Sequence, residues 1–297
     1  MLILLTNDDG IFAPGLAAIY NELKKMGEVY IVAPALEQSG VSQSLTFRTP
    51  LVVKDVFIND KRWGWGVEGS PADCVKIGVN VVCPRKPDII VSGINWGQNG
   101  GTNILYSGTL GAARDGGLMG IPSFALSVED VAAPNFVRAA EISRELMVQI
   151  LRQMEKEKPS LDVCGNPVPH IYNINMATEA LEEENPEILV APMDTTPYGN
   201  RMEERSDTFG RAYYWFVPNR RERRPECLTD MNALGQNKIV VTPLQFDMTN
   251  HAQCAVMQQW GLKAPTSEKC QEASEEKNFP KINMRTCHNG KAGRFEV

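Results

Sequence analysis

Three loops of this 297-residue chain combine glycines with oxygen-bearing side chains. The first carries Asp8 and Asp9, the second Ser39, and the third Asn95 and Asn99. Carboxylate, hydroxyl and amide oxygens are hard ligands that suit Mg²⁺ or Mn²⁺, and also Ca²⁺, better than Zn²⁺. Two adjacent carboxylates repel each other unless a cation or a proton lies between them. Alone, the aspartate pair is more typical of a turn that caps a helix, but together the three loops predict a divalent-metal site.

A fourth segment, Tyr106 to Gly111, opens a predicted helix with small residues. Ser107, Gly108 and Thr109 would expose backbone N–H groups at a helix N-terminus, which attracts anions. Alone, the segment is typical of an N-cap serine followed by glycines that allow close packing. Because it comes directly after the loop of Asn95 and Asn99, we expect it to bind phosphate.

These parts together predict hydrolysis of a phosphate ester. A divalent ion can bind a phosphate oxygen and acidify a water molecule, and one carboxylate can accept the proton of that water. Amides at the helix end can stabilise the charge that develops on the phosphoryl oxygens. Asp9 is the favoured base.

Short apolar runs alternate along the chain with segments whose apolar residues repeat at helical spacing. This pattern predicts the strands and helices that position the loops. Strands are predicted at 2–5, 29–33, 88–92 and 123–128, with helices at 14–23 and 107–119. Alternation of strand and helix predicts an α/β fold, a mainly parallel sheet flanked by helices. Ligands bind at the carboxyl ends of the strands in such a sheet, so the three loops should meet at one edge.

The rest of the chain departs from this alternation. Residues 44–67 are rich in aromatic residues and predict β-hairpins inserted beside the main sheet. Asn135 should cap a helix that reaches about Lys158, and further strands are expected at 171–174, 188–191, 212–217 and 238–242. From Leu262 the chain turns polar, so we expect an α/β phosphatase domain over 1–261 and a C-terminal extension over 262–297 that docks a partner or is largely disordered.

Composition narrows the class of protein. The formal net charge of −6 and the pI near 5.3 argue against a nucleic-acid partner, which would require a basic face. The sequence contains no apolar run of about 18 residues, and the N-terminal run is too short for a signal peptide, so no membrane partner is expected. The seven cysteines contain no C-x-x-C pair. We therefore expect a cytoplasmic protein with reduced thiols.

Two alternatives remain open. A non-catalytic sensor would bind a nucleotide or a metal tightly without releasing phosphate. An NAD-dependent enzyme would use the glycines of Gly64 to Gly69, which match G-x-G-x-x-G. That motif normally follows the first strand and opens a helix, whereas here the glycines fall within a predicted strand.

Five ordered motifs lie between Thr6 and Thr109. They are Thr6-Asn7-Asp8-Asp9-Gly10, Ala33-Pro34 with Gln38-Ser39-Gly40, Gly69-Ser70-Pro71-Ala72-Asp73-Cys74, Ser92-Gly93-Ile94-Asn95 with Gly97 and Asn99, and Tyr106-Ser107-Gly108-Thr109. Together they resemble the survival protein SurE family, and Val240 to Leu244 resembles its closing strand. The resemblance covers residues 1 to about 250. The chain differs from the family at Ser70, usually threonine, at Trp96, and over Gly100 to Asn103.

The resemblance implies a Rossmann-like fold and a divalent-metal-dependent phosphatase that hydrolyses nucleoside 5′- and 3′-monophosphates and, in some members, short polyphosphate. It implies one cation per subunit, Mg²⁺ or Mn²⁺ (or Ca²⁺ in a crystal), held by Asp8, Asp9, Ser39 and Asn95. Asn99 and Ser107 would contact the phosphate, with Gly108 and Thr109 forming its cradle. The implied catalytic residues are Asp8, Asp9, Asn99 and Ser107. A homodimer or homotetramer, formed by exchange of C-terminal segments, is implied as well.

Overall fold

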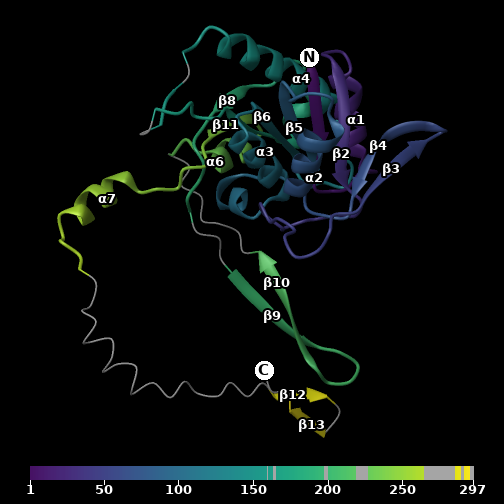
Figure 1. The fold of residues 1–297 in the computed structure, drawn as a ribbon, viewed down its shortest axis with the longest axis vertical. Coiled ribbons are helices and arrows are strands. Elements are labelled where there is room, and N and C mark those ends of the chain that lie inside the picture. The colour runs from purple at the N-terminus through teal and green to yellow at the C-terminus, as the bar shows by residue number, and fades with distance from the viewer. Residues whose placement is uncertain are drawn as a thin grey trace. The chain divides into compact units, whose positions relative to one another are not determined.

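The computed structural model describes residues 1–158, 160–162, 165–196, 200–218, 227–263, 285–288 and 291–294. The chain divides into two units, Met1–Phe246 and Asp247–Val297, earlier in the sequence than the boundary predicted after residue 261. The first unit contains a nine-stranded sheet and the hairpin of β9 (Asn200–Ser206) and β10 (Ala212–Pro218) (Figure 1). The second contains α7 (His251–Gln258) and a two-stranded sheet of β12 (Arg285–His288) and β13 (Lys291–Arg294).

The main sheet is mostly parallel, as predicted. Its strands, in their order across the sheet, are β3 (Val53–Ile58), β4 (Lys61–Val67), β2 (Glu28–Pro34), β1 (Leu2–Thr6), β5 (Ile89–Trp96), β6 (Ser123–Val128), β7 (Ile171–Met176), β11 (Ile239–Leu244) and β8 (Ile188–Val190). The six strands from β4 to β7 pair in parallel. β3 and β11 are antiparallel to β4 and β7. The sheet is therefore α/β in character, with antiparallel pairs near both edges.

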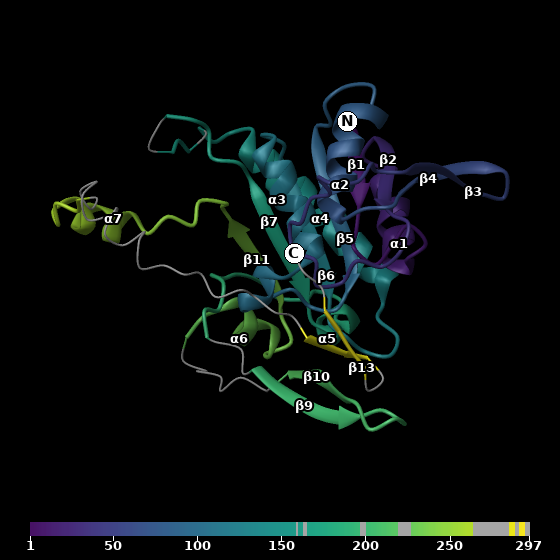
Figure 2. The same ribbon diagram turned by 60° about the horizontal axis from the view of Figure 1, so that its bottom comes forward.

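The predicted hairpin region differs from the structure in one respect. β3 and β4 do not form a sheet of their own, because β4 pairs with the open edge of β2, where Val32 is opposite Trp65. Without β4, the edge of β2 would leave backbone N–H and C=O groups without hydrogen-bond partners, and β4 supplies those partners. The hairpin extends the main sheet and reaches beyond its other strands (Figure 2). Gly64 and Gly66 lie inside β4, so their motif does not open a helix.

Helices cover both faces of the sheet. They are α1 (Pro14–Leu23), α2 (Pro71–Ile77), α3 (Gly108–Leu118), α4 (Phe136–Met154), α5 (Thr178–Glu182) and α6 (Asp230–Leu234), with a π-helical turn at Gly78–Val82 and a 3₁₀ turn at Gly101–Leu105. In β1, Ile3 and Leu5 pack in the core formed with α1 and α4, whereas Leu4 packs in the core beside α2. Alternating side chains thus bury both faces of the strand, which explains its continuous apolar run.

Most predicted elements are present with shifted ends. Asn135 caps α4 by accepting a hydrogen bond from the Arg138 N–H at 3.1 Å, but the helix ends at Met154 rather than Lys158. The strand predicted at 212–217 is β10, and it pairs with β9 outside the main sheet. β5 continues past the predicted residue 92 to Trp96 through a bulge between Ser92 and Asn95. The bulge places Asn95 within the paired strand, opposite Ser127.

Candidate active site

The structure brings the three polar loops together at the carboxyl edge of the sheet. The loop after β1 is joined to the loop after β2 by a hydrogen bond from the Gln38 N–H to the Asp8 carbonyl at 2.7 Å. It is joined to the end of β5 by a hydrogen bond from the Trp96 N–H to Asp9 Oδ2 at 3.1 Å. Because β2, β1 and β5 are neighbours in the sheet, these contacts gather Asp8, Asp9 and Asn95, with Ser39 directly after Gln38.

Asp8 is buried and fixed by the start of α3. Its Oδ1 accepts a hydrogen bond from Thr109 Oγ1 at 2.6 Å, and its Oδ2 accepts one from the Thr109 N–H at 3.0 Å. Gly108 allows this approach, because a Cβ at that position would lie 2.9 Å from Asp8 Oδ2. The helix N-terminus therefore rests directly against the first carboxylate.

This contact reduces the number of backbone N–H groups that the start of α3 can donate to a phosphate. The Thr109 N–H is bound to Asp8, and the Leu110 N–H donates to Ser107 Oγ at 3.2 Å. Among the described residues the Gly108 N–H has no partner, so Gly108 is the member of the predicted cradle with a free amide. Ser107 is buried and caps α3 through its oxygen, which leaves its hydroxyl hydrogen to donate elsewhere.

Asp9 lies in a negatively charged setting. Its partial burial raises its pKa to about 6, and the charges of Asp8 and Glu37 act in the same direction against the hydrogen bond from Trp96. Burial also raises the pKa of Asp8, against the two bonds from Thr109. In the described part of the chain, no basic side chain forms an ion pair with either carboxylate, and Asp9 Oδ1 accepts no hydrogen bond.

The other two predicted ligands also keep oxygen lone pairs available. Asn95 donates from Nδ2 to the Gly97 carbonyl at 2.6 Å, so its Oδ1 is directed away from that contact and has no partner among the described residues. Ser39 is exposed and donates to Glu37 Oε1 at 2.6 Å, which leaves its oxygen able to accept or to ligate.

The side chains that hold Asn99 were not among the predicted site residues. Ser127 of β6 accepts a hydrogen bond from Asn99 Nδ2 at 3.0 Å, and Asn173 and Asn175 of β7 bind the Asn99 backbone. The next turn of this loop is held by Asp230, whose Oδ2 accepts from the Gly101 N–H at 2.7 Å. The sequence signal for the β7 pair was an N-x-N pattern inside an apolar strand, where asparagine is unusual.

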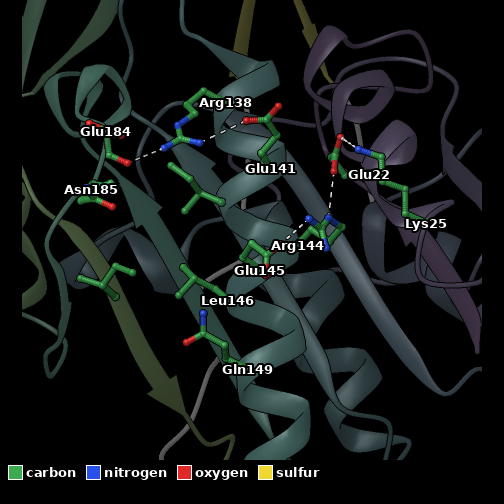
Figure 3. A pocket seen from close by; sticks show the side chains of 13 residues that line it. Glu22, Lys25, Arg138, Glu141, Arg144, Glu145, Leu146, Gln149, Glu184 and Asn185 are labelled. Carbon is green, nitrogen blue, oxygen red and sulfur yellow. Dashed lines mark hydrogen bonds and ion pairs between the residues drawn. The ribbon is translucent and has the colours of Figure 1, made fainter.

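A pocket of about 490 Å³ lies elsewhere, between α1, α4 and the residues before β8 (Figure 3). Its cations are already paired: Arg144 Nε lies 3.1 Å from Glu22 Oε2, and Arg138 donates to the Glu184 carbonyl at 3.1 Å. No residue of the predicted site lines this pocket. This pocket is therefore separate from the polar loops.

The described residues contain no group of three or more His, Cys, Asp or Glu side chains able to hold a metal, so the predicted site depends on Ser39 and Asn95 in addition to its two carboxylates. In the same part of the chain, none of the helices combines the length and the apolar character needed to cross a membrane.

Comparisons with known proteins show which family the chain resembles. The model of the family "Survival protein SurE" matches residues 3–203. The 5′-nucleotidase SurE of Rhodopirellula baltica is 42% identical over 264 residues, which are 89% of this chain and 100% of that protein. The 5′-nucleotidase SurE of Chlorobium phaeobacteroides is 36% identical over 88% of this chain and 96% of its own. The crystal structure of the SurE protein from Aquifex aeolicus superposes with a TM-score of 0.72 at 32% identity, covering 88% of this chain and 99% of that chain. The chain therefore belongs to the survival protein SurE family.

Proposed function

We propose that this protein is a divalent-metal-dependent nucleotidase that hydrolyses nucleoside 5′-monophosphates to nucleoside and phosphate. One observation carries the proposal: of two adjacent carboxylates, which form no ion pair with a basic side chain of the described residues, the first lies against the N-terminus of α3. The two carboxylates suit a cation, and the N-terminus of α3 suits an anion. The names of the relatives from Rhodopirellula and Chlorobium support the nucleotide substrate.

The residues present suit a hard divalent cation. All four proposed ligands, Asp8, Asp9, Ser39 and Asn95, offer oxygen, and Asp9 Oδ1 and Asn95 Oδ1 accept no hydrogen bond from the described residues. The raised pKa of Asp9 reflects burial beside negative charge, which a cation would relieve. Once bound, Mg²⁺ or Mn²⁺ supplies Lewis acidity toward a phosphate oxygen and a water molecule.

Three donors of the chain support the proposed binding of phosphate. The free Gly108 N–H lies at the positive end of α3, and Ser107 keeps its hydroxyl hydrogen. Asn99 Nδ2 has two hydrogens, of which one binds Ser127 Oγ while the other makes only a 3.5 Å contact with the Gly97 carbonyl. This second hydrogen is the one we assign to a phosphate oxygen.

The two aspartates differ in a way that separates their roles. Thr109 holds both oxygens of Asp8, so that side chain is fixed. Asp9 has a free oxygen and a pKa raised to about 6 by burial, so near neutral pH it is largely ionised and able to accept a proton. We therefore assign Asp9 as the base that accepts the proton of the attacking water.

The proposal extends to 3′-monophosphates and short polyphosphate, because the donors described above recognise a phosphate group rather than a nucleoside. It also includes a homodimer or homotetramer in the cytoplasm. The β9–β10 hairpin supports association: Phe209, Tyr214, Trp215 and Phe216 are at least half exposed, and such apolar surfaces mark interfaces.

The test is release of inorganic phosphate from a panel of nucleoside 5′- and 3′-monophosphates and short polyphosphate. Protein treated with EDTA should be inactive, and added Mg²⁺ or Mn²⁺ should restore release. Folded protein that binds nucleotide or metal but releases no phosphate under any of these conditions would instead be the sensor considered above.

A further inference from the structure

A row of buried polar side chains crosses the sheet beneath the loop that carries Asn99. Asn95 of β5 is opposite Ser127 of β6, and Ser127 is opposite Asn175 of β7. Asn173 lies two residues before Asn175, on the same face of β7. The side chains of Ser127, Asn173 and Asn175 are at most 1% exposed. Burying amide groups costs free energy unless they form hydrogen bonds, so their partners indicate why the sheet carries them here.

The partner of both β7 asparagines is the backbone of Asn99. Asn173 Nδ2 donates to the Asn99 carbonyl at 2.8 Å. The Asn99 N–H donates to Asn175 Oδ1 at 2.7 Å, and Asn175 Nδ2 makes a longer contact of 3.4 Å with the same carbonyl. One residue of the loop is thus held at both of its backbone groups by side chains of a strand that is distant in sequence.

We propose that Asn173 and Asn175 are positioning residues for the phosphate group of the substrate. They fix the backbone of Asn99, while Ser127 binds one hydrogen of its side-chain amide, so that the second Nδ2 hydrogen of Asn99 meets a phosphate oxygen bound at the start of α3. This inference rests on the proposed function, because it takes the ligand of Asn99 to be the phosphate of a nucleotide.

One asparagine donates a hydrogen bond and the other chiefly accepts one, so substitution by aspartate should affect the two positions differently. Asn173 acts as a donor, so Asn173→Asp would place an ionised oxygen against the Asn99 carbonyl oxygen. Asn175 acts chiefly as an acceptor, so Asn175→Asp retains the 2.7 Å bond with the Asn99 N–H, whereas Asn175→Leu removes it. If the two asparagines only filled space in the core, Asn173→Asp would not be more impaired than Asn175→Asp.

Thr242 provides a matched control. It is opposite Asn173 in β11 and is equally buried, and its hydroxyl has no hydrogen-bond partner in the described structure. Thr242→Val therefore alters a polar side chain at the same depth without touching Asn99, and its kinetics should match those of the unmodified protein.

The experiment measures the inhibition constant of inorganic phosphate and the KM and kcat for 5′-AMP, with thermal unfolding to establish that each variant is folded. Hydrogen exchange at the Asn99 amide, measured by NMR, adds a readout independent of turnover. We expect Asn175→Leu and Asn173→Asp to weaken phosphate inhibition by about tenfold or more, the scale of a lost hydrogen bond to a charged group. Asn175→Asp should remain within a few-fold of the unmodified protein, and the Asn99 amide should lose protection only in Asn175→Leu.

Unchanged phosphate inhibition in folded Asn175→Leu, or an Asn175→Asp variant as impaired as Asn175→Leu, would overturn the inference. If Asn173→Asp does not fold, the two Asn175 variants carry the test. If the unmodified protein releases no phosphate with any metal, the proposed function fails, and loss of Asn99 protection in Asn175→Leu separately decides whether β7 holds the loop.

Discussion

Thr109→Val tests whether α3 holds the first carboxylate of the site. Valine has nearly the shape of threonine but lacks the hydroxyl that donates to Asp8 Oδ1 at 2.6 Å, while the backbone bond at 3.0 Å remains. A hydrogen bond to a charged group contributes about 1.5–3 kcal/mol, so the free energy of unfolding should fall by about that amount at pH values where Asp8 is ionised. Thr109→Ser, which retains the hydroxyl and loses one methyl group, should cost only about 0.8 kcal/mol.

The loss should also depend on pH. Burial raises the folded-state pKa of Asp8 above its unfolded value, so its contribution to stability is most favourable in acid and declines as pH rises through the folded pKa. Loss of the Thr109 hydroxyl raises that pKa further, so the difference between Thr109→Val and the unmodified protein should grow as Asp8 ionises. Urea unfolding in EDTA, over a series of pH values from acid to alkaline, measures both effects. A Thr109→Val variant no less stable than Thr109→Ser at every pH of the series would refute the reasoning.

Three further predictions concern the same edge of the sheet. Asp9→Asn should lower kcat by about 100-fold or more, the usual effect of losing a general base. The same variant should not lower the melting temperature of the metal-free protein, because it removes a carboxylate whose pKa is raised to about 6 by burial. For the same reason, Mn²⁺ should bind more tightly as pH rises from about 5 to 7, since the ion competes with a proton on Asp9; a titration with the same affinity at both pH values would contradict this. Gly108→Ala should lower kcat/KM although alanine favours helix, because its Cβ would lie 2.9 Å from Asp8 Oδ2; near-normal turnover would show that α3 can move without consequence.

The sequence was sufficient to predict which loops would meet. Short apolar strands alternating with helices favour parallel pairing, and parallel strands end at a common edge, so Asp8, Ser39 and Asn95 were predicted to lie at the same edge of the sheet. The structure adds that the strands before these loops, β1, β2 and β5, are neighbours. The hydrogen bonds Gln38–Asp8 and Trp96–Asp9 are the direct consequence of that order. The metal ligands and the phosphate contacts inferred from the family motifs stay predictions.

The contacts that depend on tertiary approach could not be predicted. Ser107 to Thr109 was expected to leave its amides free, but Thr109 binds Asp8 because Gly108 lets the helix come close. The role of Asn173 depends on where the loop after β5 lies over β7, a strand more distant in sequence, which no local pattern specifies. The hairpin of β3 and β4 was recognised, but its pairing with β2 follows from an open sheet edge rather than from its own residues.

We propose that Asp8 and Asp9 bind the metal ion at which phosphate esters are hydrolysed. The most direct measurement is phosphate release from 5′-AMP by EDTA-treated protein during titration with Mn²⁺, alongside Mn²⁺ binding followed by electron paramagnetic resonance. We expect release to appear as one ion binds per chain, and we expect Asp9→Asn to lose release and to weaken Mn²⁺ binding. Release that persists in EDTA, or Mn²⁺ binding that Asp9→Asn does not change, would contradict the proposed metal site.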